Sequence, residues 1–213
     1  MNRSRARSAP SRESGLSLLE VIVAIAILTV VATASGTLAL TGMAAGATQE
    51  RRQVAVTIAS GVMESLSAQT IATSATTGVS GLYTGSTSVA VTAAWLALSS
   101  APGVAQTYPG WDPTATTLST PTIPITTYPT QVGTNYTVTT LIGTCFQPTA
   151  GGDCGRLVGQ IAAPALPPTG YTGLIRAIVV VSWTAGKTCA SGCSYTTSTL
   201  IDPSNDLAWV SHG

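Results

Sequence analysis

The amino-acid sequence predicts an α+β protein in which a long N-terminal membrane-spanning helix packs on an antiparallel β-sheet. Three observations support this fold class. Between Leu16 and Gln69 the chain contains no proline, and the first part of this stretch is almost free of charge. After residue 80, segments rich in β-branched and aromatic residues alternate with proline-rich stretches. Only 8% of the 213 residues are charged, against about 25% in an average soluble domain, which indicates a membrane-linked or exported protein.

The N-terminal end changes character abruptly at residue 16. Residues 1–15 are polar and carry four arginines, whereas Glu20 is the one charged residue between Leu16 and Ala47. A helix needs about 20 apolar residues to cross the hydrocarbon core of a bilayer, so this stretch is long enough to span. Arginines precede the span and none follows it directly. We therefore expect a single-pass protein with a cytoplasmic N-terminus and an extracytoplasmic C-terminal domain.

Glu20 stands out because a carboxylate within an apolar span costs about 2.5–3.5 kcal/mol on insertion scales. The sequence leaves two explanations for how the Glu20 carboxylate avoids this cost. The side chain lies close enough to the start of the span to reach the headgroups. Alternatively, it pairs with a positive group that another chain supplies.

The ten residues from Gly15 to Ala24, GLSLLEVIVA, resemble the type IV prepilin motif. The resemblance implies that prepilin peptidase cuts between Gly15 and Leu16 and methylates the new N-terminal residue, Leu16. It also implies that Glu20 is the assembly glutamate, which pairs with the N-terminal amine of a neighbouring pilin subunit. Further implied partners are the membrane and an inner-membrane assembly platform. Leu16 departs from the usual phenylalanine, which puts the efficiency of methylation in question.

An ordinary secretory signal is the rival interpretation of this segment. Ala32-Thr33-Ala34 offers a small-x-small cleavage site, after which the mature chain would begin at Ser35. Two facts count against it: Glu20 would lie in the apolar core of the signal, and the apolar run continues well beyond the cut.

Beyond the span, residues 47–70 predict an amphipathic continuation of the same helix. Val54, Ile58, Val62 and Leu66 recur every four residues and form one apolar stripe. A helix of about 50 residues would be about 75–80 Å long. The expected organisation is therefore a leader at 1–15, a membrane half at 16–46, an amphipathic half at 47–70 and a β-rich domain at 71–213.

Four segments of the β-rich domain have the composition of strands. The third is apolar on both faces, so we expect it to be central, with the helical stripe covering one face of the sheet. Residues 100–130 and 145–173 contain many prolines and predict long loops. The predicted strands are Thr87–Ala93, Tyr136–Gly143, Leu174–Trp183 and Tyr195–Ile201.

The four cysteines fall as two close pairs. An even number in an exported chain favours disulfides, and pairing within each pair is the simplest of three connectivities. A zinc site is the alternative, but the first pair is wider than the usual spacing of zinc ligands. We expect Cys189–Cys193 to form a tied hairpin turn, and Cys145 to pair with Cys154.

Catalytic chemistry has little support. His212 is the single histidine and lies next to the C-terminal residue, and we expect no catalytic residue, no metal and no cofactor. Asp202 and Asp206 bracket a turn-like segment in which calcium binding is conceivable, although polar turn residues are the default. The net charge is +1, and Arg156, Arg176 and Lys187 are the basic residues beyond residue 80, so we expect no nucleic-acid partner.

The favoured function is that of a structural subunit, a minor pilin or pseudopilin, of a type IV pilus or a type II secretion-like filament. One alternative is a pilus-associated adhesin or DNA-uptake subunit that uses the Thr/Pro-rich loops and exposed tryptophans, with Trp95, Trp111 and Trp209 as candidates. The other is a membrane-anchored or secreted β-domain in which Glu20 is incidental.

Overall fold

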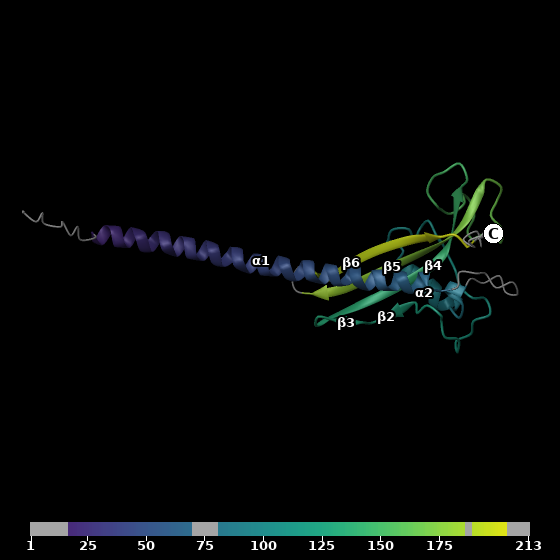
Figure 1. The fold of residues 1–213 in the computed structure, drawn as a ribbon, viewed down its shortest axis with the longest axis horizontal. Coiled ribbons are helices and arrows are strands. Elements are labelled where there is room, and N and C mark those ends of the chain that lie inside the picture. Colours follow the sequence, from purple (N-terminus) through teal and green to yellow (C-terminus); the bar gives the residue numbers. More distant parts are fainter. Residues whose placement is uncertain (1–16, 70–80, 186–188, 204–213) are drawn as a thin grey trace, which may run out of the picture. The chain divides into compact units, whose positions relative to one another are not determined.

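The structure is a computed structural model and describes residues 17–69, 81–185 and 189–203 (Figure 1). The chain divides into two compact units, one ending at Thr48 and the other beginning at Gln49.

The predicted long helix is confirmed. Helix α1 runs over Leu18–Ser67, 50 residues, and is drawn in purple to blue in Figure 1. Good helix formers, above all leucine and alanine, and the absence of proline explain its length, whereas Gly36, Gly42 and Gly46 do not interrupt it. The predicted α+β class is likewise confirmed, because the second unit is built on an antiparallel sheet.

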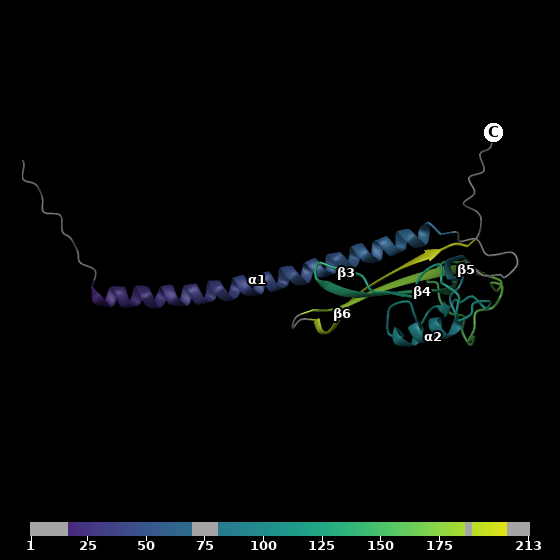
Figure 2. The same ribbon diagram turned by 90° about the horizontal axis from the view of Figure 1, so that it is seen from below.

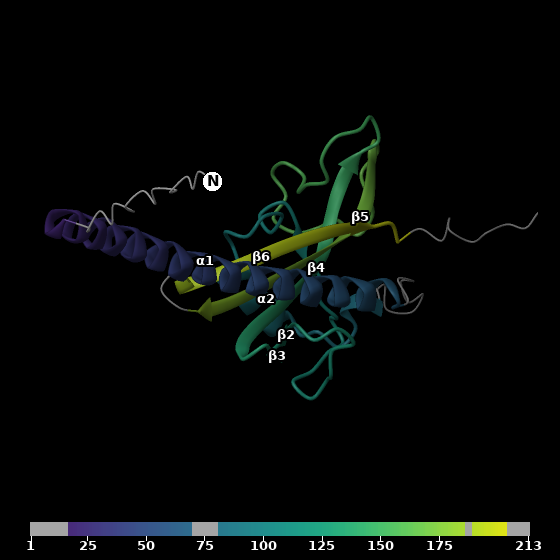
Figure 3. The same ribbon diagram turned by 60° about the vertical axis from the view of Figure 1, so that its left-hand side comes forward.

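Three long strands form the centre of that sheet: β4 (Thr134–Pro148), β5 (Tyr171–Ala185) and β6 (Cys189–Ile201). Strand β5 lies between β4 and β6, as Figures 1 and 3 show, so the expectation that the most apolar segment is central is confirmed. Val138 of β4 lies opposite Val181 of β5. The far edge of β4 pairs with three two-residue strands, β1 (Tyr108–Pro109), β2 (Thr126–Thr127) and β3 (Thr130–Gln131).

Alternate residues of β5 supply two different cores. On one face, Ala177, Val179 and Val181 are fully buried and belong to the cluster that includes Ala55 and Ala59 of α1. The part of α1 from Gln49 onward therefore covers this face, as the apolar stripe predicts (Figure 2). The remaining α1 side chains in this cluster are Val54, Ile58, Val62, Met63 and Leu66.

The other face of the sheet is covered by a second helix, α2 (Ser88–Ala97). Its Val91 and Trp95 pack with Ile178 and Val180 of β5. Figure 2 shows α2 and the C-terminal part of α1 on opposite sides of the sheet. A short 3-10 helix, η1 (Gly81–Tyr83), buries Leu82 in the core on the α1 side.

The predicted strand at Thr87–Ala93 is wrong, because these residues begin α2. Thr87 caps the helix: its side chain accepts a hydrogen bond from the backbone N–H of Ala90 at 3.3 Å. The apolar contacts are made by Val91 and Trp95, four residues apart, which is helical spacing. The alternation of Val89 and Val91 suggested a strand, yet Val89 is 79% exposed.

The predicted hairpin turn at Cys189–Cys193 is also wrong. Both cysteines lie in β6, where Cys193 is opposite Trp183 and Cys189 is opposite Ala185. Between these two pairs β6 contains four residue positions where β5 contains two, so the register of the two strands shifts there. The extra residues of β6 accommodate the segment that the disulfide closes. The loop expected at 145–173 is shorter, since β4 extends to Pro148 and β5 begins at Tyr171.

Candidate functional site

The first turn of α1 is organised by Ser17. Its Oγ accepts a hydrogen bond from the backbone N–H of Glu20 at 3.2 Å, and its carbonyl accepts from the same N–H at 2.9 Å. Serine is a favoured residue at the N-cap of a helix, and a serine followed three residues later by glutamate is the spacing of a capping box. The chain before Ser17, with Gly15 and Leu16, lies outside the described residues.

Glu20 lies in this first turn with its side chain exposed. The first turn of a helix favours a negative charge by about 0.3–1 kcal/mol, because the unpaired N–H groups carry partial positive charge. The next charged residue along α1 is Glu50. Glu20 is therefore a single carboxylate at the start of α1, followed by a long uncharged stretch of the same helix.

The uncharged part of α1 exposes its apolar side chains. Leu18 is 81% exposed, Leu28 is 69% exposed and Met43 is 72% exposed. Contiguous apolar surface of this kind requires lipid or another protein surface to cover it. Within the described residues, α1 is the one helix long and apolar enough to cross a membrane, judged by its length and composition.

The hydroxyl groups of this segment are satisfied within the helix. Each donates a hydrogen bond to a backbone carbonyl three or four residues earlier, at 2.8–3.1 Å. A hydroxyl without a partner in hydrocarbon would be costly, so this arrangement suits a helix in lipid. The residues are Thr29, Thr33, Ser35, Thr37, Thr41 and Thr48.

The four cysteines form two local disulfides in the structure, Cys145–Cys154 and Cys189–Cys193, with Cα–Cα distances of 5.4 Å and 5.2 Å. Sulfur atoms bonded to each other cannot serve as thiolate ligands of zinc. Among the residues that the structure describes, no group of three or more histidine, cysteine, aspartate or glutamate side chains could hold a metal ion.

Two arginines of the second unit bind backbone oxygens. Arg176 donates to the carbonyl of Cys154 at 2.6 Å, and burial lowers its pKa. Arg156 donates to the carbonyl of Thr107 through Nε at 2.9 Å and Nη2 at 2.6 Å, and it lies over the ring of Tyr108. Both guanidinium groups thus fasten the 103–108 and 154–157 segments beside the sheet.

Asp112 is a buried, hydrogen-bonded carboxylate that sequence reasoning overlooked as an anchor. Its Oδ1 accepts from the hydroxyl and the backbone N–H of Thr114, and its Oδ2 accepts from the backbone N–H of Gly85. These bonds, the Thr114 hydroxyl first, lower the pKa of Asp112. The signal in the sequence was Asp112-Pro113-Thr114, the pattern of an aspartate that bonds to the residue two positions on.

The other candidates are dispersed. Trp95 is buried between α2 and the sheet, whereas Trp111 is 40% exposed. Asp202 directly follows β6. Four further candidates, Lys187, Asp206, Trp209 and His212, lie outside the described residues.

Comparison with known proteins assigns the N-terminal segment. The sequence model of the prokaryotic N-terminal methylation motif matches residues 10–36, which include Gly15, Leu16 and Glu20. No curated protein and no solved structure shows significant similarity to the chain. The match, together with the long apolar helix that begins at Leu18, shows that this chain carries the N-terminal signature of type IV pilins and pseudopilins.

Proposed function

We propose that the chain is a structural subunit, a minor pilin or pseudopilin, of a type IV pilus or a type II secretion-like filament. The observation that carries this proposal is Glu20, an exposed carboxylate in the first turn of a helix that exposes its large apolar side chains from Leu18 to Met43. The methylation motif at residues 10–36 supports it.

Assembly follows from the charge of Glu20. Cleavage between Gly15 and Leu16 would create a new α-amino group, which is largely protonated at neutral pH because its ordinary pKa is about 7.7–8.0. Two isolated charges in an apolar environment are each costly, and they neutralise each other when neighbouring helices lie side by side. Glu20 of one subunit would therefore pair with the amine of Leu16 of the next. Methylation of that amine preserves its charge.

The topology follows from the arginines of the leader. They would keep the N-terminus in the cytoplasm, where prepilin peptidase and the assembly platform act on it. The second unit would then lie outside the cytoplasm. Its two disulfides agree with an oxidising compartment.

The DNA-uptake alternative gains no support from the two described arginines beyond residue 80. The guanidinium groups of Arg156 and Arg176 donate to backbone carbonyls of the same unit. A groove that binds nucleic acid needs cations free to meet phosphates.

Substitution of Glu20 tests the proposal. Glu20→Gln keeps the size of the side chain and removes its charge, Glu20→Asp keeps the charge, and Glu50→Gln is the matched control in the second unit. We expect Glu20→Gln to reach the membrane in wild-type amounts and to be lost from sheared filament fractions. Glu20→Asp should recover part of the incorporation, and Glu50→Gln should behave as wild type. Wild-type incorporation of Glu20→Gln would overturn the proposal.

A further inference from the structure

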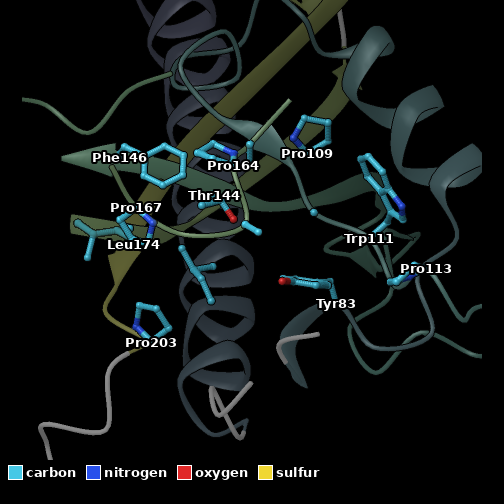
Figure 4. Close-up of a pocket in the computed structure, with 15 residues that line it drawn as sticks. Tyr83, Pro109, Trp111, Pro113, Thr144, Phe146, Pro164, Pro167, Leu174 and Pro203 are labelled. Atoms are coloured by element: carbon cyan, nitrogen blue, oxygen red, sulfur yellow. The ribbon is translucent and has the colours of Figure 1, made fainter. Parts of the chain in front are cut away.

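A cavity of about 520 Å³ lies beside the sheet in the second unit (Figure 4). Residues 109–113, residues 163–167 and the facing ends of β4 and β5 form its walls, together with Tyr83 and Pro203. Its labelled lining residues in Figure 4 are Tyr83, Pro109, Trp111, Pro113, Thr144, Phe146, Pro164, Pro167, Leu174 and Pro203.

The wall that carries Trp111 is held in place by its neighbour Asp112. The backbone N–H of Asp112 donates to the carbonyl of Ser86 at 2.9 Å, and its carboxylate accepts from the N–H of Gly85 at 2.9 Å. Gly110 packs so closely on the ring of Tyr83 that an added Cβ would lie 3.2 Å from it. The aromatic wall is therefore formed before any ligand arrives.

The chemistry of the cavity favours an apolar peptide. Among the described residues that line it, none is charged, and its side-chain hydrogen-bonding groups belong to Tyr83, Thr144 and Trp111. A charged ligand would lose its hydration there without gaining a partner. Aromatic and proline side chains instead offer large apolar surfaces to another aromatic ring.

The end of this chain meets that requirement. Pro203 lines the cavity, and residues 204–213 follow it directly. They begin with the polar Ser204-Asn205-Asp206, typical of a chain reversal, and continue with Leu207-Ala208-Trp209-Val210. Trp209 is six residues beyond Pro203, so the intervening chain reaches up to about 20 Å. That is long enough to turn back into the cavity.

We propose that the C-terminal segment 204–213 docks into this cavity of its own chain and inserts the indole of Trp209 beside Trp111. The docked segment joins the 109–113 and 163–167 segments across the end of the sheet. This interaction does not depend on Glu20 or on filament assembly.

The test uses the full chain in detergent micelles, with its tryptophans replaced by 5-fluorotryptophan and each fluorine resonance assigned by a Trp→Phe variant. A soluble gadolinium chelate broadens the resonances of exposed rings. We expect Trp209 to be protected from the chelate in the wild type. Ala163→Phe, which narrows the cavity, should remove that protection. The matched control is Ala162→Phe, since Ala162 is the neighbour that does not line the cavity, and it should leave Trp209 protected.

Trp209→Ala supplies an independent measurement. Removal of the indole should make Trp111 more accessible to the chelate and leave the buried Trp183 unchanged. Two results would overturn the proposal: a Trp209 as accessible in the wild type as in urea, or a Trp209 that stays protected in Ala163→Phe. The second result would place the segment elsewhere on the protein.

Discussion

The backbone N–H of Glu20 donates a hydrogen bond to Ser17 Oγ at 3.2 Å, so the residue proposed to direct assembly also belongs to the cap of its helix. The carboxylate of Glu20 is stabilised in the first turn by the partial positive charge of the helix N-terminus. The helix itself therefore stabilises the negative charge of Glu20 before any neighbouring subunit is present. The pairing proposed above would add an intermolecular partner to this turn.

The first prediction concerns this cap. Ser17→Ala removes the side-chain acceptor of the Glu20 N–H, leaves the backbone carbonyl acceptor of residue 17 in place, and should destabilise the start of α1 by about 0.5–2 kcal/mol. Amide hydrogen exchange at Glu20 in detergent micelles should accelerate, by about fivefold for 1 kcal/mol. Ser17→Thr retains a hydroxyl at the same position and should exchange much more slowly than Ser17→Ala. Equal exchange rates in the wild type and Ser17→Ala would show that the side chain does not cap the helix.

A second prediction concerns the contact of β1 with β4. Gly143 of β4 is tightly enclosed: a Cβ there would lie 2.0 Å from the carbonyl oxygen of Tyr108 and 2.9 Å from Cγ2 of Thr107. Gly143→Ala should push β1 away from the sheet and cost about 1–3 kcal/mol of stability, because the core cannot absorb the extra carbon. Thermal unfolding of the purified chain measures this loss.

Gly155→Ala is the control for that substitution. Gly155 bridges to Phe146 of β4, yet nothing lies within 4 Å of an added Cβ. The melting temperature of Gly155→Ala should stay close to that of the wild type. Equal melting temperatures for the two variants would contradict the enclosure of Gly143.

A third prediction concerns pH. The pKa of Asp112 is lowered in the folded state by the hydroxyl of Thr114 and the backbone N–H of Gly85. A lowered folded pKa stabilises the protein above the unfolded value of about 3.9, and this stabilisation is lost as pH falls through the folded pKa. Asp112→Asn should therefore be less stable than the wild type at pH 7, by about 1.5–3 kcal/mol for charge-assisted hydrogen bonds.

The difference in stability between the wild type and Asp112→Asn should shrink as pH falls below about 3.9, because the carboxylate of the unfolded chain takes up its proton first and the folded carboxylate follows at lower pH. Chemical unfolding of both proteins at pH 7 and at pH 3 measures this difference in the free energy of unfolding. Glu64→Gln, which changes an exposed carboxylate on α1, should stay within about 0.5 kcal/mol of the wild type. A difference that is the same at both pH values would refute the role given to the Asp112 carboxylate.

The long helix, the central strand and the face that the helix covers could be predicted because they follow from periodicity. Val54, Ile58 and Val62 recur at helical spacing, and residues 177–181 of β5 form an unbroken apolar run. The same logic failed at residues 87–93, where Val89 and Val91 alternate by chance and the cap formed by Thr87 decides in favour of helix. A short apolar segment contains too few residues to distinguish the helical period of 3.6 residues from the strand period of two.

Features that depend on contacts between distant segments could not be predicted. Arg176 bonds to Cys154, 22 residues away, and Asp112 bonds to Gly85, 27 residues away, and no local pattern encodes either pair. The edge strands β1, β2 and β3 are two residues long and exist because β4 offers them hydrogen bonds. At the other extreme, the start of the helix was identifiable because its signal lies in ten consecutive residues.

The N-terminus of the mature protein tests the central claim most directly. Intact-mass and N-terminal peptide analysis of the chain purified from membranes should find a protein that begins at Leu16 and carries one methyl group on its α-amine. Removal of residues 1–15 would take away four of the eight arginines along with Glu13. A mature chain that begins at Ser35, or one that retains residues 1–15, would contradict the account.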